Sequence, residues 1–179
     1  MAARILSERF YERDTLTAAK ELLGCFLVRK IGRKTWRARI TEVEAYVGED
    51  DLACHASKGR TKRTETMYGE PGHAYVYLIY GMYHCLNIVT EKGGFPAAVL
   101  VRAVEVEDVP KKETDGPGKL CRFLEIDRTF DAWDVTRGEK LWVERGRLGK
   151  GEEIEATKRI GVEYAGHCKE YLWRFEIAK

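Results

Sequence analysis

Short runs of apolar and polar residues divide the chain into predicted strands and helices. β-Branched and aromatic residues cluster in strand-like runs at 25–31, 35–45 and 97–106. Further strands and loops are expected in the C-terminal third. A helix is predicted over residues 15–23, where Asp14 can cap the start and Gly24 ends the pattern. A second helix is predicted over residues 120–125.

Residues 75–89 are the stretch around which the chain is organised. Two strand-like runs on either side of Gly81 predict an antiparallel hairpin, reversed at Gly81-Met82. Tyr80, Met82 and Tyr83 surround this turn, although turn residues normally face water. Such aromatic residues either cover a neighbouring helix or, if Tyr80 is exposed, form a wedge that enters a minor groove and unstacks a base step.

The strand predicted over residues 35–45 carries carboxylates among apolar positions. A period of two aligns three apolar residues and then two carboxylates on one face: Trp36, Ala38, Ile40, Glu42 and Glu44. A buried carboxylate is costly unless it is paired, so Glu44 is either a structural ion-pair partner or a functional acid or base. Arg102, in the next long strand, is expected to pair with a carboxylate or a backbone carbonyl for the same reason.

A long polar segment, residues 48–72, precedes the hairpin and is expected to be irregular. Its basic run is either solvated surface or, beside an aromatic hairpin, a patch that contacts phosphates: Arg60, Lys62 and Arg63. Gly116-Pro117-Gly118-Lys119 lacks the spacing of a nucleotide-binding P-loop, so no nucleoside triphosphate site is expected. A contact from this helix start, including Lys119, to a nucleic-acid phosphate is compatible with the sequence.

The composition is that of one domain covering residues 1–179. The formal charge of +2, from 31 basic and 29 acidic side chains, makes any nucleic-acid surface a local patch. Five widely spaced cysteines without a Cys-x-x-Cys pair indicate reduced thiols. Neither a signal-peptide core nor a run of about 18 apolar residues occurs, so a cytoplasmic protein without membrane association is expected.

Residue spacing does not support two common kinds of catalytic centre. Cys54-His55 and His84-Cys85 lack the spacing of a metal site, and neither serine lies in a Gly-x-Ser-x-Gly elbow, so neither a metal site nor a serine hydrolase centre is expected. What remains is Glu44, with Tyr46, His55 and the tyrosine hairpin. A carboxylate can activate water against a sugar carbon while aromatic rings hold a flat leaving group. This combination favours cleavage of an N-glycosidic bond.

Eight segments, in their order along the chain, carry a resemblance to a known family. They are Glu42 to Gly48, His55, Gly59-Arg60-Thr61, Pro71 to Met82, Cys85-Leu86-Asn87, Val99 to Ala103, Gly116 to Cys121 and Arg159-Ile160-Gly161-Val162. Together they closely resemble the alkyladenine (3-methyladenine) DNA glycosylase family over nearly the whole chain. Thr64 and Glu70 depart from the Asn and Pro that this family often has at these positions.

The resemblance implies a monofunctional DNA glycosylase of base excision repair that needs no metal or organic cofactor. Such an enzyme flips damaged purines out of double-stranded DNA, among them 3-methyladenine, 7-methylguanine, hypoxanthine and ethenoadenine, and hydrolyses the N-glycosidic bond to leave an abasic site. Glu44 matches the general base for the attacking water, and Arg102 matches the arginine that helps to place this water.

The resemblance also implies roles for the residues around the base. Tyr46, His55 and Tyr77 match the side chains that sandwich it, and Asn87 matches a residue of the pocket floor that discriminates against the amino group of guanine. Tyr80 matches the wedge, and Met82 joins it at the hairpin tip. The basic side chains expected on the DNA backbone are Arg60, Lys62, Arg63 and Lys119.

We therefore expect a mixed α+β domain with a curved, mainly antiparallel sheet flanked by helices and a protruding hairpin beside the pocket. It would act as a monomer on DNA, in the cytoplasm or, in a eukaryote, the nucleus. If Tyr77 and Asn87 pair across the hairpin, the turn is centred on Met82 and has an odd number of residues. A non-catalytic damage-binding module and an RNA-directed hydrolase remain as alternatives.

Overall fold

Eight strands form one curved antiparallel sheet in the computed structural model, which describes residues 4–178. The main order is β3-β4-β5-β2-β1-β6, with β8 paired to β2 and β7 paired to β8. The strands are β1 (Phe26–Ile31), β2 (Lys34–Val47), β3 (Ala74–Ile79), β4 (Tyr83–Val89), β5 (Ala97–Val106), β6 (Leu141–Glu144), β7 (Glu153–Thr157) and β8 (Arg174–Ala178). The predicted mixed α+β fold with a curved antiparallel sheet is confirmed.

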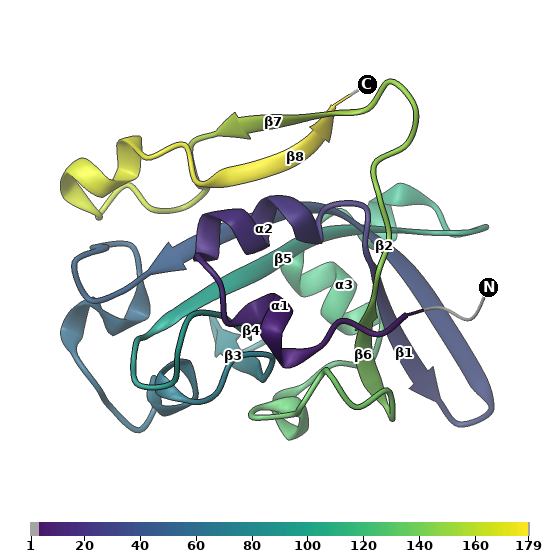
Figure 1. The fold of residues 1–179 in the computed structure, drawn as a ribbon, viewed down its shortest axis with the longest axis horizontal. Helices are drawn as coiled ribbons and strands as arrows, with labels where there is room; N and C mark the ends of the chain where they lie inside the picture. Colours follow the sequence, from purple (N-terminus) through teal and green to yellow (C-terminus); the bar gives the residue numbers. More distant parts are fainter. Residues whose placement is uncertain (1–3, 179) are drawn as a thin grey trace.

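Short helices flank this sheet: α1 (Glu8–Tyr11), α2 (Thr15–Leu22) and α3 (Pro117–Phe123). The carboxylate of Asp14 accepts a hydrogen bond from the Thr17 N–H at 2.8 Å, which is the predicted cap of α2. α2 packs against β2 and β5, whereas α3 packs against β4 and β5. Figure 1 shows α1 and α2 in front of the sheet, the fainter α3 farther back, and β7 with β8 as a hairpin at the top.

The strand β2 is the longest of the sheet and contacts three others. It pairs with β1 through its first half, with β5 along most of its length, and with β8 at residues 42–44. The ladder to β5 is irregular at Glu42, on either side of which the register shifts. The main apolar core includes Ala38 and Ile40 before this point and Val43 and Ala45 after it. The carboxylates of β2 therefore come from the centre of the sheet.

The hairpin of β3 and β4 closes through a loop of three residues, because Ile79 pairs with Tyr83. Tyr80 and Gly81 both have positive φ, at 52° and 69°. This left-handed pair centres the turn on Gly81, one residue earlier than the predicted Met82, while the predicted odd number of residues is correct.

This shift changes which residues pair across the hairpin. Tyr77 lies opposite Cys85 and Asn87 lies opposite Tyr75, so the prediction that Tyr77 and Asn87 pair directly is wrong. They share one face of the hairpin as diagonal neighbours, because the alternation of side chains places these positions on the same side. Both can therefore line one site.

The tip of the hairpin is exposed. Tyr80 is 84% exposed and Met82 is 65% exposed, so neither side chain covers a helix. Farther back, Tyr83 faces α3, where a Cβ at Gly118 would lie 3.1 Å from the Tyr83 ring. The interpretation of the tip aromatics as core is thus wrong for Tyr80, whereas Tyr83 does face a helix.

The segments between the strands contain short 3-10 helices. Residues 48–72 contain the 3-10 helices η1 (His55–Lys58) and η2 (Glu65–Tyr68), as expected for an irregular segment. The other 3-10 helices are η3 (Lys111–Glu113), η4 (Arg128–Phe130) and η5 (Gly166–Glu170). No helix between residues 4 and 178 combines the length and apolar character needed to cross a membrane.

The five cysteines are all buried and form no disulfide. Burial raises the pKa of the Cys54 thiol to about 12, and it also raises the pKa values of Cys25, Cys85 and Cys121. These four side chains are therefore neutral thiols at physiological pH.

Candidate active site

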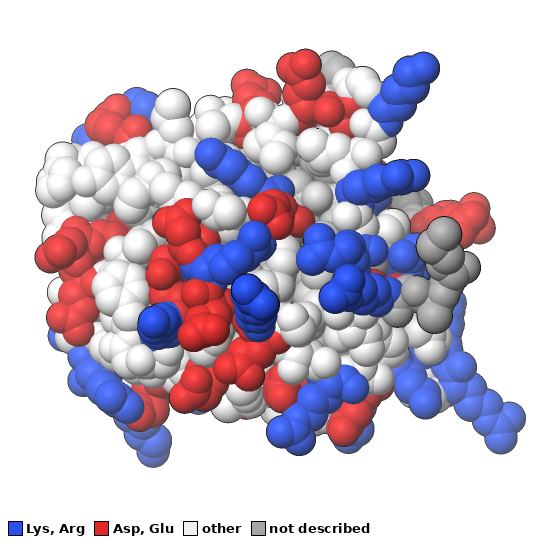
Figure 2. All heavy atoms as spheres, in the orientation of Figure 1, with Lys and Arg blue, Asp and Glu red and all other residues white. Residues whose placement is uncertain are grey.

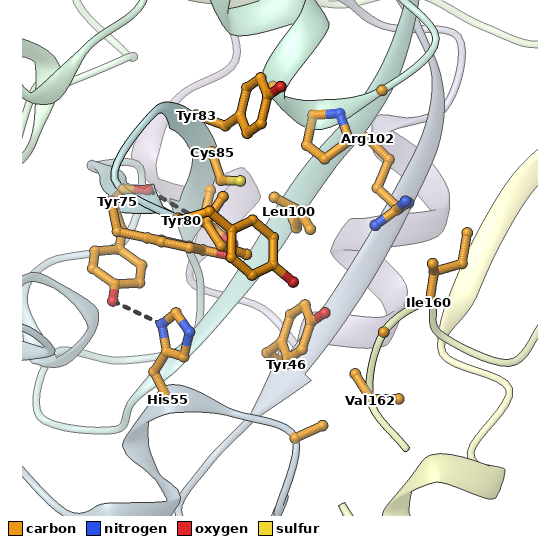
Figure 3. A pocket seen from close by; sticks show the side chains of 18 of the residues that line it. Tyr46, His55, Tyr75, Tyr80, Tyr83, Cys85, Leu100, Arg102, Ile160 and Val162 are labelled. Carbon is orange, nitrogen blue, oxygen red and sulfur yellow. Dashed lines mark hydrogen bonds between the residues drawn. The ribbon is translucent and has the colours of Figure 1, made fainter. Parts of the chain in front are cut away.

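A cavity of about 610 Å³ opens between the hairpin, the start of α3 and the segment 160–164. Figure 3 shows aromatic side chains from separate elements turned into it. It is lined by most of the residues singled out in the sequence: Tyr46, His55, Tyr77, Tyr80, Asn87, Arg102 and Lys119. Residues far apart in the chain are thus brought to one place, as the resemblance implies.

Aromatic rings from several elements line the cavity. Tyr46, near the end of β2, is one of them, and His55 and Tyr77 contact each other edge to face, with ring centroids 4.5 Å apart. His55 Nδ1 also lies 3.0 Å from the Tyr75 hydroxyl. Burial, together with the charge of Arg63, lowers the pKa of His55 to about 4, so the imidazole is neutral at pH 7.

Tyr75 is a site residue that the sequence analysis did not single out. It lines the cavity, and its hydroxyl holds the His55 ring. Its position two residues before Tyr77 was the available signal, since alternation puts both on one face of β3. Burial raises the pKa of Tyr75 to about 12, so its hydroxyl stays protonated.

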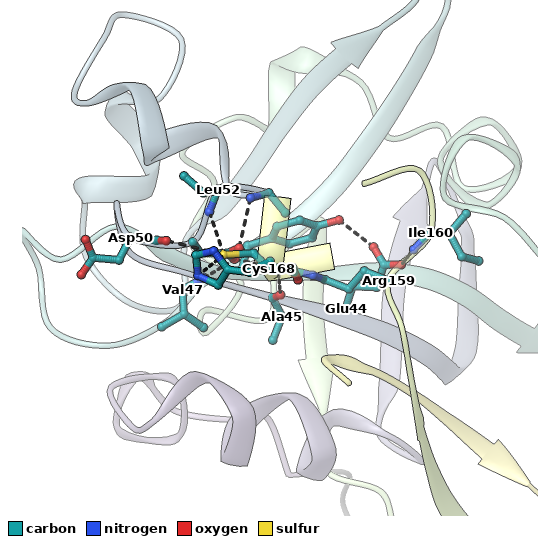
Figure 4. Close-up of polar contacts among 12 residues, drawn as sticks. Glu44, Ala45, Val47, Asp50, Leu52, Arg159, Ile160 and Cys168 are labelled. Atoms are coloured by element: carbon teal, nitrogen blue, oxygen red, sulfur yellow. Dashed lines mark hydrogen bonds and ion pairs between the residues drawn. The ribbon is translucent and has the colours of Figure 1, made fainter. Parts of the chain in front are cut away.

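Glu44 is fully buried and does not itself line the cavity, but it contacts three residues that do: Tyr46, Arg102 and Ile160. One carboxylate oxygen, Oε2, accepts a hydrogen bond from the Tyr46 hydroxyl at 2.7 Å. The other, Oε1, accepts one from the backbone N–H of Ile160 at 2.8 Å (Figure 4). The same oxygen lies 3.4 Å from Nη1 of Arg102. Burial, and next the charge of Glu44, raise the pKa of Tyr46 well above its ordinary value. The phenol therefore remains a donor to the carboxylate.

Arg102 has the carboxylate partner expected of it. Its Nε donates a hydrogen bond to Oε1 of Glu42 at 2.9 Å, in addition to the weaker contact with Glu44. The same oxygen of Glu42 accepts a hydrogen bond from Nε of Arg174, on β8, at 2.6 Å. Arg102 lines the cavity, and the two other side chains lie behind it. The site thus has two carboxylates and two guanidinium groups in alternation.

A buried ion pair anchors the segment that holds Glu44. The guanidinium of Arg159 donates to both carboxylate oxygens of Asp51, at 2.6 and 2.8 Å, and to the Ala45 carbonyl at 2.9 Å (Figure 4). Its central carbon lies 4.9 Å from the ring centroid of Tyr46. Neither Asp51 nor Arg159 was predicted to have a role, although Arg159 belongs to one of the segments that carry the resemblance.

Asn87 and Cys85 lie on the hairpin at the cavity. The side-chain amide of Asn87 donates to the Tyr75 carbonyl at 3.1 Å, which leaves its carbonyl oxygen available. Cys85 faces Tyr77 across the strand pair, and its thiol has a pKa raised mainly by burial. This surface therefore combines one amide with a neutral thiol.

The predicted phosphate-contacting residues are spread over the surroundings of the cavity. Lys119 lines it and pairs with Asp115 at 2.7 Å, whereas Arg63 lies with its guanidinium carbon 5.7 Å from the centroid of the Tyr77 ring. Arg60 forms two hydrogen bonds with Glu65, at 2.9 and 2.5 Å, and Lys62 is exposed. Arg63 and Lys119 are thus closest to the cavity.

Thr64, one of the departures from the family pattern, fixes this basic loop. It is buried, and its hydroxyl accepts a hydrogen bond from the Thr61 N–H at 2.9 Å.

Basic and acidic side chains are intermixed on the face shown in Figure 2, so this face is not a uniformly basic surface. Among residues 4–178, no group of three or more His, Cys, Asp or Glu side chains is arranged to hold a metal ion.

Comparison with known proteins identifies similar chains. The model of a family described as methylpurine-DNA glycosylase (MPG) matches residues 9–179. A protein of Methanocella arvoryzae is 50% identical over 96% of this chain and 91% of its own length. Proteins of Alkaliphilus oremlandii and Legionella pneumophila are 45% and 47% identical, over 96% and 97% of this chain and 95% and 94% of their own lengths. The names of all three assign them to the 3-methyladenine DNA glycosylases.

Proposed function

The chain belongs to the methylpurine-DNA glycosylase family, and we propose that it excises alkylated and deaminated purines from double-stranded DNA. Its substrates would include 3-methyladenine, 7-methylguanine, hypoxanthine and ethenoadenine, and its products a free base and an abasic site. It acts as a monomer of one domain, without a cofactor, as the first enzyme of base excision repair.

The observation that carries the proposal is the setting of Glu44. A fully buried carboxylate lies directly behind the lining of an aromatic cavity, where it is fixed by the Tyr46 hydroxyl, the Ile160 N–H and Arg102, all from residues that line the cavity. Burying such a group is costly, and a carboxylate with remaining lone pairs beside a cavity suits a general base.

The proposed reaction is hydrolysis by a water molecule that Glu44 activates. Glu44 takes a proton from a water molecule, whose oxygen forms a bond to C1′ of the deoxyribose. The bond between C1′ and the purine nitrogen breaks, and its electron pair leaves with the base. Arg102 stays beside Glu44 and orients the water, while the surrounding protein excludes bulk solvent.

The cavity walls support recognition of an extruded purine. Its volume of about 610 Å³ accommodates a purine, and Tyr46, His55 and Tyr77 offer aromatic faces for stacking. Asn87 is the polar group of the hairpin that would discriminate against the amino group of guanine. Flipping costs a few kcal/mol of unstacking, least for a damaged or mispaired base.

The exposed hairpin tip supports contact with the duplex. Tyr80 lines the rim of the cavity and is 84% exposed, so it can occupy the gap that a flipped nucleotide leaves. Met82 lies beside it on the same turn. Arg63 and Lys119 lie near the cavity and would contact phosphates, while Arg60 and Lys62 extend this contact along the loop.

A single-turnover assay with matched duplexes that contain one hypoxanthine or one 7-methylguanine tests the proposal. The wild type should release free base, and Glu44→Gln should lose about 100-fold or more of the rate while it still binds the lesion duplex. Glu105→Gln makes the same change from carboxylate to carboxamide at an exposed position of β5. It is the matched control and should retain the wild-type rate.

Three outcomes would contradict parts of the proposal. Tight lesion binding without release of either base would favour a damage-binding module. An equal rate for Glu44→Gln and the wild type would remove the general-base role, and a strict requirement for a 2′-hydroxyl would favour an RNA-directed hydrolase.

A further inference from the structure

We propose that Glu42 is a positioning residue for base excision, which holds the guanidinium of Arg102 beside Glu44, and that Arg174 of β8 holds Glu42 in turn. The inference rests on the proposed function and adds two residues to it. Neither Glu42 nor Arg174 lines the cavity, and among the described residues the one cavity-lining side chain that forms a hydrogen bond with Glu42 is Arg102, so each would act through Arg102 rather than on the substrate.

A single carboxylate oxygen joins the two arginines. Oε1 of Glu42 accepts from Nε of Arg102 at 2.9 Å and from Nε of Arg174 at 2.6 Å. The side chains of Glu42, Arg102 and Arg174 are only 17, 15 and 18% exposed, so water screens these contacts weakly. Charge-assisted hydrogen bonds in such a setting fix the direction of each guanidinium plane.

Glu42 keeps Arg102 from closing onto Glu44. An arginine that faces one free carboxylate tends to form a bidentate pair and occupies both oxygens. Here Nε of Arg102 lies 2.9 Å from Glu42, whereas its Nη1 remains 3.4 Å from Glu44. The oxygens of Glu44 therefore keep lone pairs that a general base needs for the proton of water.

The backbone holds Glu42 from both edges of β2. On one edge it lies opposite Ala103 of β5, at the irregularity of that ladder, and on the other it lies opposite Glu176 of β8. Arg174 is itself fixed by Glu176, 3.1 Å away, and by the Thr157 hydroxyl at 3.0 Å. The C-terminal hairpin of β7 and β8 thus delivers a cation to the residue that orients Arg102.

Separate measurements of rate and affinity test the proposal. The rate is the single-turnover release of hypoxanthine at saturating enzyme, and the affinity is that for a duplex with a tetrahydrofuran abasic analogue. Glu42→Gln should lower the rate about 10-fold or more and change the affinity by less than about 3-fold, because only Arg102 is reoriented. Glu42→Asp, which keeps the charge, should recover part of the rate.

A second variant keeps the test decisive if Glu42→Gln folds poorly. Arg174→Lys retains the charge but not the planar guanidinium, so it should lower the same rate about 3-fold or more without a loss of affinity. The double variant Glu42→Gln/Arg174→Lys should be no slower than Glu42→Gln alone, because both changes act on one contact. Glu155→Gln, an exposed position of β7, is the control and should keep the wild-type rate.

Different results overturn different statements. No base release by the wild type would contradict the proposed function, and the positioning role would fall with it. Release by the wild type together with an unchanged rate for Glu42→Gln would overturn the positioning role alone. Equal losses of rate and affinity, or multiplicative effects in the double variant, would do the same.

Discussion

The hydroxyl of Tyr46 donates a hydrogen bond to Oε2 of Glu44 across 2.7 Å, which ties the aromatic wall of the cavity to its buried carboxylate. The two residues are two positions apart on β2, so the alternation of the strand places them on one face. Tyr46 therefore has two tasks in the proposed reaction, because its ring contacts the base and its hydroxyl orients Glu44.

Tyr46→Phe should separate these two tasks. The ring remains, so the affinity for lesion DNA should change by less than about 3-fold. The rate of base release should fall about 10-fold or more, because a hydrogen bond to a charged group contributes about 1.5–3 kcal/mol. Single-turnover assays and equilibrium binding measure the two effects, and Tyr46→Ala should lose both rate and affinity. An unchanged rate for Tyr46→Phe would mean that Tyr46 contributes to base release through its ring alone.

The left-handed backbone of Tyr80 predicts a conflict between stability and function. Tyr80→Gly and Tyr80→Ala both remove the ring, so both should dissociate faster from lesion duplexes than the wild type. Glycine adopts positive φ without a Cβ clash. The free energy of unfolding of Tyr80→Gly should therefore be about 1 kcal/mol higher than that of Tyr80→Ala. Urea denaturation and dissociation kinetics test this, and slow dissociation of either variant would argue against a wedge.

The neutral state of His55 predicts a pH dependence of stability. Its pKa is lowered to about 4 in the folded chain, mainly by burial, from an ordinary value of 6.5. Between these pH values the unfolded chain binds a proton that the folded chain does not, so stability should fall as pH drops from about 6.5 to 4, by up to roughly 3 kcal/mol. Above pH 6.5 this contribution to the pH dependence vanishes.

Urea midpoints measured across this range check the role of His55. Between pH 6.5 and 4, His55→Gln should reduce the slope of the free energy of unfolding against pH by the equivalent of about one bound proton. His167→Gln, at an exposed position, should keep the wild-type slope. Identical slopes for His55→Gln and the wild type would show that His55 titrates normally.

The buried pair of Asp51 and Arg159 should contribute more to stability than the exposed ion pairs do. Asp51→Asn leaves the fully buried guanidinium without its counter-charge and should lower the free energy of unfolding by about 3–5 kcal/mol. Glu65→Gln breaks the exposed pair with Arg60 and should change stability little. Chemical denaturation measures both, and similar small effects would mean that Arg159 finds other partners.

Local rules predicted most of the elements of the fold. The cap at Asp14 and the strand over residues 97–106 follow from short-range chemistry, and both are observed. The hairpin was predicted, but its centre was not, because a tyrosine at positive φ is a rare choice that no propensity favours. A shift of the turn centre by one residue, from Met82 to Gly81, was enough to change the partner of Tyr77 from Asn87 to Cys85.

The sequence predicted which residues belong to the candidate site better than it predicted the contacts between them. Alternation on β2 and the resemblance indicated Glu44 and Tyr46, and a buried arginine required a carboxylate near Arg102. The links through Asp51, Arg159 and Arg174 depend on segments more than 100 residues apart in sequence, as in the 108-residue separation of Arg159 and Asp51. Such contacts follow from tertiary packing, which one sequence does not encode locally.

The burial of the cysteines affects how readily alkylating agents can react with the protein. Alkylating agents, which create methylated purines, also attack proteins, and among their side chains the thiolate is a strong nucleophile. Four of the five thiols have raised pKa values and so remain protonated at neutral pH, and all five are shielded from solvent. We therefore expect the protein to lose less activity to such reagents than a variant that carries an exposed, ionised thiol.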